Sequence, residues 1–178
     1  EPLSPTGQNQ SIELYDFLAR RQIAAVYISA YLRTRQTIEY SAQQLNLTPI
    51  LDERLNEIDN GYLDGMSDEE IEKKYPETLR AFHERSADFR FPGGETGEEA
   101  RQRIASFFDE KLQQHGQQSI AVVSHEGLIR IMACHILGLP VYKRWNFGYD
   151  FCGITEITYQ PAYQQWQLKR FNYVHTLS

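Results

Sequence analysis

One stretch of the sequence decides the fold, and it reads Ile120-Ala-Val-Val-Ser-His-Glu-Gly-Leu-Ile-Arg130. Its leading apolar run is typical of a short strand buried on both faces of a parallel sheet. The segment from Glu126 to Leu137 then predicts a helix, because its apolar residues recur at helical spacing. His125 is therefore expected in a surface turn between the carboxyl end of a strand and the amino terminus of a helix. Open α/β sheets bind ligands at that edge, and free helix N–H groups there favour anions.

A second apolar run, Ala24 to Ile28, also predicts a buried strand, followed by a helix from about Ala30 to Leu45. Arg33 falls in the first turn of that helix, close to the same sheet edge. A cation at this position opposes the helix dipole, so Arg33 is better explained by facing an anion than by stabilising the helix. Arg35 points to another side of the helix, where we expect a solvated charge.

Glu57 lies within Leu55-Asn-Glu-Ile-Asp-Asn-Gly61, a loop in which apolar residues flank the carboxylate. A carboxylate held partly away from water is what a general acid requires. Each of the three residues also has a purely structural interpretation: His125 as a capping residue, Arg33 as a surface charge and Glu57 as a loop residue in water. Their order along the chain, Arg33, Glu57 and then His125, favours one shared site.

Helix start signals organise the rest of the chain. Ser4 predicts the cap of a helix that runs to about Arg20. Capping-box signatures at Ser67 and Thr96 predict two more helix starts. The first of these lies inside an excursion over residues 58–95, which is long enough to cover an active site.

The carboxyl-terminal region alternates between apolar and polar residues. Segments 153–159 and 165–171 are joined by a turn and predict an antiparallel hairpin. We therefore expect one domain over residues 1–178, an α/β fold with a three-layer αβα sandwich. Its sheet should be mostly parallel, with the helical insertion at 58–95 over the active-site edge and the hairpin at the end.

The composition limits the class of function. The chain has 178 residues, of which 41% are hydrophobic and 24% charged, and this is typical of a soluble globular domain. A net charge of −6 argues against general binding to nucleic acid or to an anionic membrane. Cys134 and Cys152 have neither metal-ligand nor redox-motif spacing and fit a reduced, cytoplasmic chain. The sequence leaves the oligomeric state open.

Five segments, in the same order, resemble motifs of the histidine phosphatase superfamily, also called the phosphoglycerate mutase-like family. They are Pro2-Leu-Ser-Pro-Thr-Gly7-Gln-Asn-Gln10, Ser29-x-x-x-Arg33-x-x-x-Thr37, Leu55-Asn-Glu57, Pro92-Gly-Gly-Glu-Thr96 with Arg103, and Val123-Ser-His125-Glu-Gly127-x-x-Arg130. The chain's ending, Phe171-Asn-Tyr-Val-His175-Thr-Leu, is also similar to that of the family. The resemblance spans nearly the whole chain.

The resemblance implies a phosphoryl-transfer site that uses no metal and no cofactor. Arg33 would clamp phosphate oxygens with its planar guanidinium group. His125 would hydrogen-bond the same oxygens and stabilise their charge in the transition state. Glu57 would protonate the leaving oxygen and then help to activate water.

Three further residues are expected to contact the substrate: Glu126, Gly127 and Tyr62. Glu126 replaces the first of two glycines that often follow the second histidine of the family, and it places a carboxylate near an anion site. Tyr62 belongs to a group of aromatic residues in the insertion, some of which could line a substrate pocket.

The family's nucleophile is a histidine in an Arg-His-Gly motif on a first strand, upstream of the Pro-Leu-Ser segment. The sequence begins at Glu1, on the threshold of that segment, so we expect the first strand and its histidine to lie upstream. The remaining histidines, His83, His115, His135 and His175, stand in contexts unlike that motif.

The resemblance thus implies a phosphatase that hydrolyses small-molecule phosphate monoesters through a phosphohistidine intermediate, with a small phosphorylated metabolite as its partner. Phosphoglycerate mutase-type transfer is the alternative enzyme, although the stretch from Glu57 to Gly94 is short for enclosing a bisphosphate intermediate. A third hypothesis is a non-catalytic module that binds phosphate or a partner, which would apply if the nucleophile is truly absent.

Overall fold

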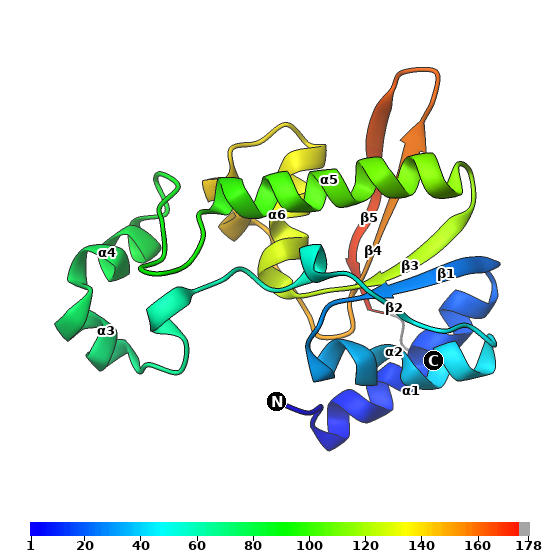
Figure 1. The fold of residues 1–178 in the computed structure, drawn as a ribbon, viewed down its shortest axis with the longest axis horizontal. Coiled ribbons are helices and arrows are strands. Elements are labelled where there is room, and N and C mark those ends of the chain that lie inside the picture. Colours follow the sequence, from blue (N-terminus) through cyan, green and yellow to red (C-terminus); the bar gives the residue numbers. More distant parts are fainter. Residues whose placement is uncertain (175–178) are drawn as a thin grey trace.

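The computed structural model describes residues 1–174, so His175 and the rest of the expected ending lie outside it. Its central sheet is parallel and has the strand order β2–β1–β3 (Figure 1). The strands are β1 (Ile23–Ile28), β2 (Ile50–Leu51) and β3 (Ser119–Val123). Ile28, the last residue of β1, pairs with Leu51 on one side and Val123 on the other. The carboxyl ends of all three strands therefore meet at one edge.

Helices cover both faces of this sheet, as expected for an αβα sandwich. They are α1 (Pro5–Ala19) and α2 (Leu32–Gln44) on one face, and α5 (Gly97–His115) and α6 (Glu126–Ile136) on the other. Val26 of β1 packs with Ile38 of α2 in one buried cluster. Its neighbour Tyr27 packs with Phe107 of α5 and Leu128 of α6 in a second cluster. Successive residues of β1 thus pack in the hydrophobic clusters on opposite faces of the sheet, which explains why the strand is apolar throughout.

The helices begin at the predicted caps. The side chain of Ser4 accepts a hydrogen bond of 3.1 Å from the N–H of Gly7 in α1. Complete capping boxes at Ser67 and Thr96 open α3 (Asp68–Lys74) and α5. Helix α4 (Pro76–Glu84) follows α3, and the two lie on the side of the sheet toward which β1 and β3 run (Figure 1).

The carboxyl-terminal hairpin consists of β4 (Ile154–Gln160) and β5 (Gln165–Tyr173), after a short helical segment, η3 (Val141–Asn146). Within residues 1–174, β3 pairs only with β1 and β4 pairs only with β5, so the hairpin is a sheet of its own. A cavity of about 750 Å³ is lined by residues of both β3 and β4. We call this cavity the β3–β4 groove.

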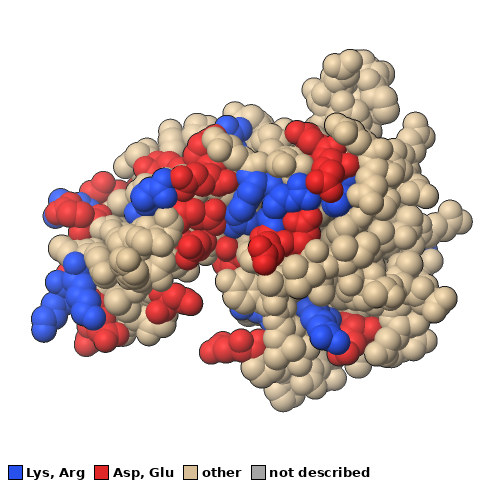
Figure 2. Space-filling model, in the orientation of Figure 1, with Lys and Arg blue, Asp and Glu red and all other residues tan. Residues whose placement is uncertain are grey.

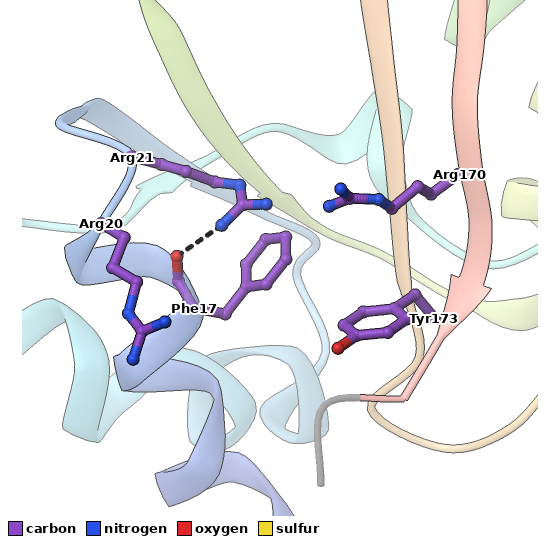
Figure 3. Close-up of a pocket in the computed structure, with 5 residues that line it drawn as sticks. All are labelled: Phe17, Arg20, Arg21, Arg170 and Tyr173. Atoms are coloured by element: carbon purple, nitrogen blue, oxygen red, sulfur yellow. Dashed lines mark hydrogen bonds between the residues drawn. The ribbon is translucent and has the colours of Figure 1, made fainter. Parts of the chain in front are cut away.

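The end of α1 also contacts the hairpin. Arg21 forms an ion pair of 3.5 Å with Glu156 of β4, and the rings of Phe17 and Tyr173 lie 6.3 Å apart. A pocket of about 270 Å³ lies between them, and Arg20 and Arg170 complete its walls (Figure 3). In the described part of the chain, no helix is long and apolar enough to cross a membrane.

Candidate active site

His125 caps the amino terminus of α6, directly after β3. Its side chain is buried, with 5% of the residue exposed. Tyr31, between β1 and α2, packs on it with the two ring centroids 5.1 Å apart and the rings edge to face. The predicted strand–turn–helix is therefore correct, but the predicted surface position of His125 is wrong. The residues that cover it are distant in the sequence and leave no mark in the local pattern.

Arg33 lies against His125 at the same edge of the sheet. Its Nε atom donates a hydrogen bond of 3.0 Å to Nδ1 of His125. The guanidinium carbon also lies 4.5 Å from the centre of the Tyr31 ring. Arg35, on the next part of the helix, is exposed to solvent. The first turn of α2 thus brings one arginine to the histidine and leaves the other on the surface.

Burial and positive charge keep the imidazole of His125 neutral. Removal from water lowers the pKa of His125, and the charges of Arg33 and Arg103 lower it further, to about 3. Near neutral pH the ring therefore carries a single proton and no charge. An incoming dianion would face the positive charge of Arg33 rather than that of the imidazole.

Glu57 occupies the amino terminus of α6. Its carboxylate accepts hydrogen bonds from the backbone N–H groups of Gly127, at 3.2 Å, and of Leu128, at 3.1 Å. These are the free helix N–H groups that the sequence suggested for an external anion. A residue of the chain itself satisfies them, so the phosphate of a substrate would depend on side chains such as Arg33.

Arg103 holds the Glu57 loop in place from α5. Its guanidinium group donates to the backbone carbonyls of Arg54, at 2.6 Å, and of Glu57, at 3.2 Å. The same group forms an ion pair of 2.6 Å with Glu95. Since both partners are largely shielded from solvent, this arrangement fixes the backbone from which the Glu57 side chain extends.

The three residues expected on the substrate side differ in their surroundings. Glu126 forms an ion pair of 2.6 Å with Arg130, one turn further along α6. The backbone N–H of Gly127 donates a hydrogen bond to the carboxylate of Glu57, as described above. Tyr62 is 64% exposed and lies over Gly93, where an added Cβ would be 2.9 Å from the tyrosine ring.

Two buried hydroxyl groups lie beside His125, and neither was given a role from the sequence. Ser29 opens the motif around Arg33, and Thr34 is an unspecified position of the same motif. The Oγ of Ser29, the residue after β1, lies 2.8 Å from Nε2 of His125. The Oγ1 of Thr34 lies 2.9 Å from the same serine oxygen. A serine at the end of a buried strand is the signal that could have drawn attention to this pair, because polar groups gather at that edge.

The other described histidines lie elsewhere. His115 bonds the hydroxyl of Tyr27 at 2.7 Å, His135 lies in the last turn of α6, and His83 belongs to α4. Within residues 1–174, none of the three joins Arg33 and Glu57. In the same residues, no group of three or more histidine, cysteine, aspartate or glutamate side chains is placed to hold a metal ion.

On the face that Figure 2 shows, acidic and basic side chains are interleaved. In Figure 2 basic side chains lie at the centre of the face, over α5 and the loop before it, with acidic side chains around them. This agrees with ion pairs such as Arg54 with Glu110 and Arg101 with Glu98. Positive charge is therefore local, as at Arg33, which suits a small anion better than an extended polyanion.

Comparison with known proteins agrees with this geometry. The model of the histidine phosphatase superfamily (branch 1) matches residues 1–174. Phosphoserine phosphatase 1 of Hydrogenobacter thermophilus is 36% identical over 148 residues, which are 83% of this chain and 70% of that protein. A probable phosphoglycerate mutase, GpmB, of Salmonella choleraesuis is 27% identical over 165 residues, 93% of this chain and 76% of that protein.

Solved structures show the same fold. The native structure of a mycobacterial glucosyl-3-phosphoglycerate phosphatase superposes with a TM-score of 0.85 at 22% identity, covering 97% of this chain and 87% of that one. The sandwich, the edge site and the family match agree with one another. The chain belongs to the histidine phosphatase superfamily.

Proposed function

We propose that this protein hydrolyses phosphate monoesters of small metabolites, with Arg33, positioned by His125, holding the phosphoryl group. The observation that carries the proposal is the 3.0 Å contact between these two side chains at the carboxyl edge of a parallel sheet. A guanidinium group matches the oxygen spacing of a phosphate. Arg33 has no carboxylate partner among the ion pairs of residues 1–174, so its charge is available to a ligand.

Glu57 is proposed as the acid. Its carboxylate is anchored on α6, the helix that His125 begins, so both groups are positioned by one element. The proton of Glu57 would pass to the ester oxygen as its bond to phosphorus breaks. In the second half of the reaction, Glu57 would take a proton from the attacking water.

The attacking group is proposed to be a histidine on a strand that precedes Glu1. Its ring nitrogen would bond to phosphorus while the alcohol leaves, and water would then break the N–P bond and release inorganic phosphate. The β3–β4 groove supports this placement. Within the described residues it lies between two strands, each with a partner on one side only, and one added strand would join the two sheets.

For the substrate, we propose phosphoserine as the first compound to test, since the relative at 36% identity is named a phosphoserine phosphatase. Glu126, Gly127 and Tyr62 remain the proposed substrate contacts. We also propose a cytoplasmic location without a nucleic-acid partner. Support comes from two free cysteines, Cys134 and Cys152, and from the net charge of −6.

The test compares Arg33→Ala with Arg35→Ala, a matched pair two residues apart on one helix. In a protein that carries the proposed strand with the attacking histidine, Arg33→Ala should lower phosphate release from phosphoserine on the order of 100-fold, while Arg35→Ala should behave as wild type. Isothermal titration of inorganic phosphate should show the same contrast. Equal effects of the two changes would refute the proposed clamp.

Two outcomes would favour the alternatives. Phosphate binding that depends on Arg33, without release of phosphate from any monoester, would identify a binding module. Transfer of the phosphoryl group between the two hydroxyls of phosphoglycerate, faster than its release, would identify a mutase. The 27% identical relative named as a probable phosphoglycerate mutase is the reason to include that substrate.

A further inference from the structure

A series of hydrogen bonds links the Nε2 side of the His125 ring to two buried hydroxyl groups. Nε2 of His125 lies 2.8 Å from the Oγ of Ser29, which lies 2.9 Å from the Oγ1 of Thr34. Thr34 Oγ1 in turn lies 2.8 Å from the backbone carbonyl of Tyr31. Ser29 and Thr34 are 1% and 2% exposed, so water cannot replace these partners.

The direction of each hydrogen bond in this series follows from Arg33. Its Nε–H is a donor only, so Nδ1 of His125 must be the acceptor and carries no proton. The single proton of the neutral ring is therefore on Nε2 and is donated to Ser29. The hydroxyl of Ser29 then donates a hydrogen bond to Thr34 Oγ1, and the hydroxyl of Thr34 donates one to the carbonyl of Tyr31. The opposite direction would set a proton on Nδ1 against the N–H of Arg33.

We propose that Ser29, supported by Thr34, is a positioning residue that holds the proton of His125 on Nε2 and so leaves Nδ1 to accept from Nε of Arg33, which orients the guanidinium group toward the phosphoryl group. Ser29 also accepts a bond of 3.2 Å from the backbone N–H of Tyr31, which fixes its oxygen in the turn after β1. A donor chain of this kind sets the tautomer and the orientation of an imidazole at once. The proposal rests on the proposed function only in naming the phosphoryl group as the ligand.

Nuclear magnetic resonance tests the tautomer directly. Long-range ¹H–¹⁵N spectra of the ligand-free wild-type chain near pH 7 should show a protonated Nε2 and an unprotonated Nδ1 for His125. A proton on Nδ1, or rapid exchange between the two nitrogens, would overturn the proposal. This measurement requires no variant and no turnover.

Variants of the hydroxyl chain test its role. Ser29→Ala leaves the Nε2 proton without its acceptor, so both tautomers of His125 should become populated and the ¹⁵N chemical shifts of Nδ1 and Nε2 should approach each other. Inorganic phosphate should bind about tenfold more weakly. Thr34→Val should act in the same direction, because Ser29 loses its acceptor. Thr34→Ser keeps the hydroxyl and should restore both the spectrum and the affinity.

Ser41→Ala is the matched control. Ser41 is also a buried residue of α2, but its hydroxyl has no hydrogen-bond partner among the described residues. Spectra and phosphate affinity that are the same in Ser29→Ala as in Ser41→Ala would refute the role of Ser29. If the wild type shows the predicted tautomer but binds no phosphate, the proposed function fails and the assignment of the proton stands. If it binds phosphate with the other tautomer, only this inference fails.

Discussion

Gly127 and Glu57 lie so close together that a Cβ on the glycine would stand 2.7 Å from a carboxylate oxygen of the glutamate. The carboxylate can bind the N–H groups at the start of α6 only because no side chain covers them. The glycine after Glu126 therefore has a steric role, which is to let the carboxylate of Glu57, 70 residues away in the sequence, reach the helix that begins at His125.

Gly127→Ala should therefore lower activity by displacing Glu57. We expect kcat for an alkyl phosphate to fall on the order of tenfold, since the acid loses its position but remains in the loop. Steady-state kinetics of the purified variant measure this. Gly148→Ala is the control, because a Cβ there would meet nothing within 4 Å. If the two variants have the same kcat, the contact does not position the acid.

Glu57→Gln should slow poor leaving groups more than good ones. An alkyl phosphate needs its leaving oxygen protonated, whereas p-nitrophenyl phosphate loses its phenolate with little help. Arg33→Ala should slow both substrates alike, because Arg33 would contact the phosphoryl group that they share. The measurement is kcat/KM for both substrates with both variants. Equal losses in all four combinations would mean that Glu57 only shapes the pocket, and Asp59 or Glu126 would be the next carboxylates to test.

Activity should persist after treatment with EDTA. Arg33, held in place by its hydrogen bond to Nδ1 of His125, would supply the positive charge that a metal ion provides in other phosphatases. The assay is release of phosphate before and after chelation, with and without added Mg²⁺ or Zn²⁺. Loss on chelation that a divalent ion restores would contradict this mechanism.

Acid should destabilise the fold through His125. The folded pKa of about 3 lies below the ordinary value of 6.5, so between these limits the unfolded chain binds more protons than the folded one. The free energy of unfolding should therefore fall as the pH drops below 6.5, with a maximum slope from this group of about 1.4 kcal/mol per pH unit. Urea denaturation at pH 7, 6 and 5 measures the slope.

His125→Gln removes this contribution and should flatten the dependence. Burial and the charge of Arg101 also lower the pKa of His135, so His135 makes the free energy of unfolding fall with pH in the same direction. The contribution of His125 is therefore the difference in slope between the variant and the wild type. His83→Gln, at an exposed position of α4, should keep the wild-type slope. A His125→Gln variant with an unchanged slope would mean that the imidazole is not buried in its neutral form.

Local signals in the sequence predicted the elements well. The caps at Ser4, Ser67 and Thr96 fix the starts of α1, α3 and α5, because a cap is decided by three or four consecutive residues. The apolar run and the helical periodicity around His125 gave β3 and α6 within one residue at each end. The order of Arg33, Glu57 and His125 along the chain favoured one shared site, and the family resemblance gave each of them a role.

Contacts between distant residues could not be predicted in this way. The bond from Ser29 to His125 spans 96 positions, and the one from Leu128 to Glu57 spans 71. Such contacts depend on how β1, β3 and the Glu57 loop pack, and no short pattern records that packing. This is why the burial of His125 and the filled amino terminus of α6 were missed.

Within residues 1–174, one side of β3 has no partner strand. A strand with one unpaired side presents a row of backbone N–H and C=O groups, and the β3–β4 groove surrounds that row with apolar side chains such as Leu128 and Met132. An edge of this kind is a template on which a second chain can add a strand. The strand proposed to carry the attacking histidine would occupy this row, so the element that completes the site would also close the edge against another chain.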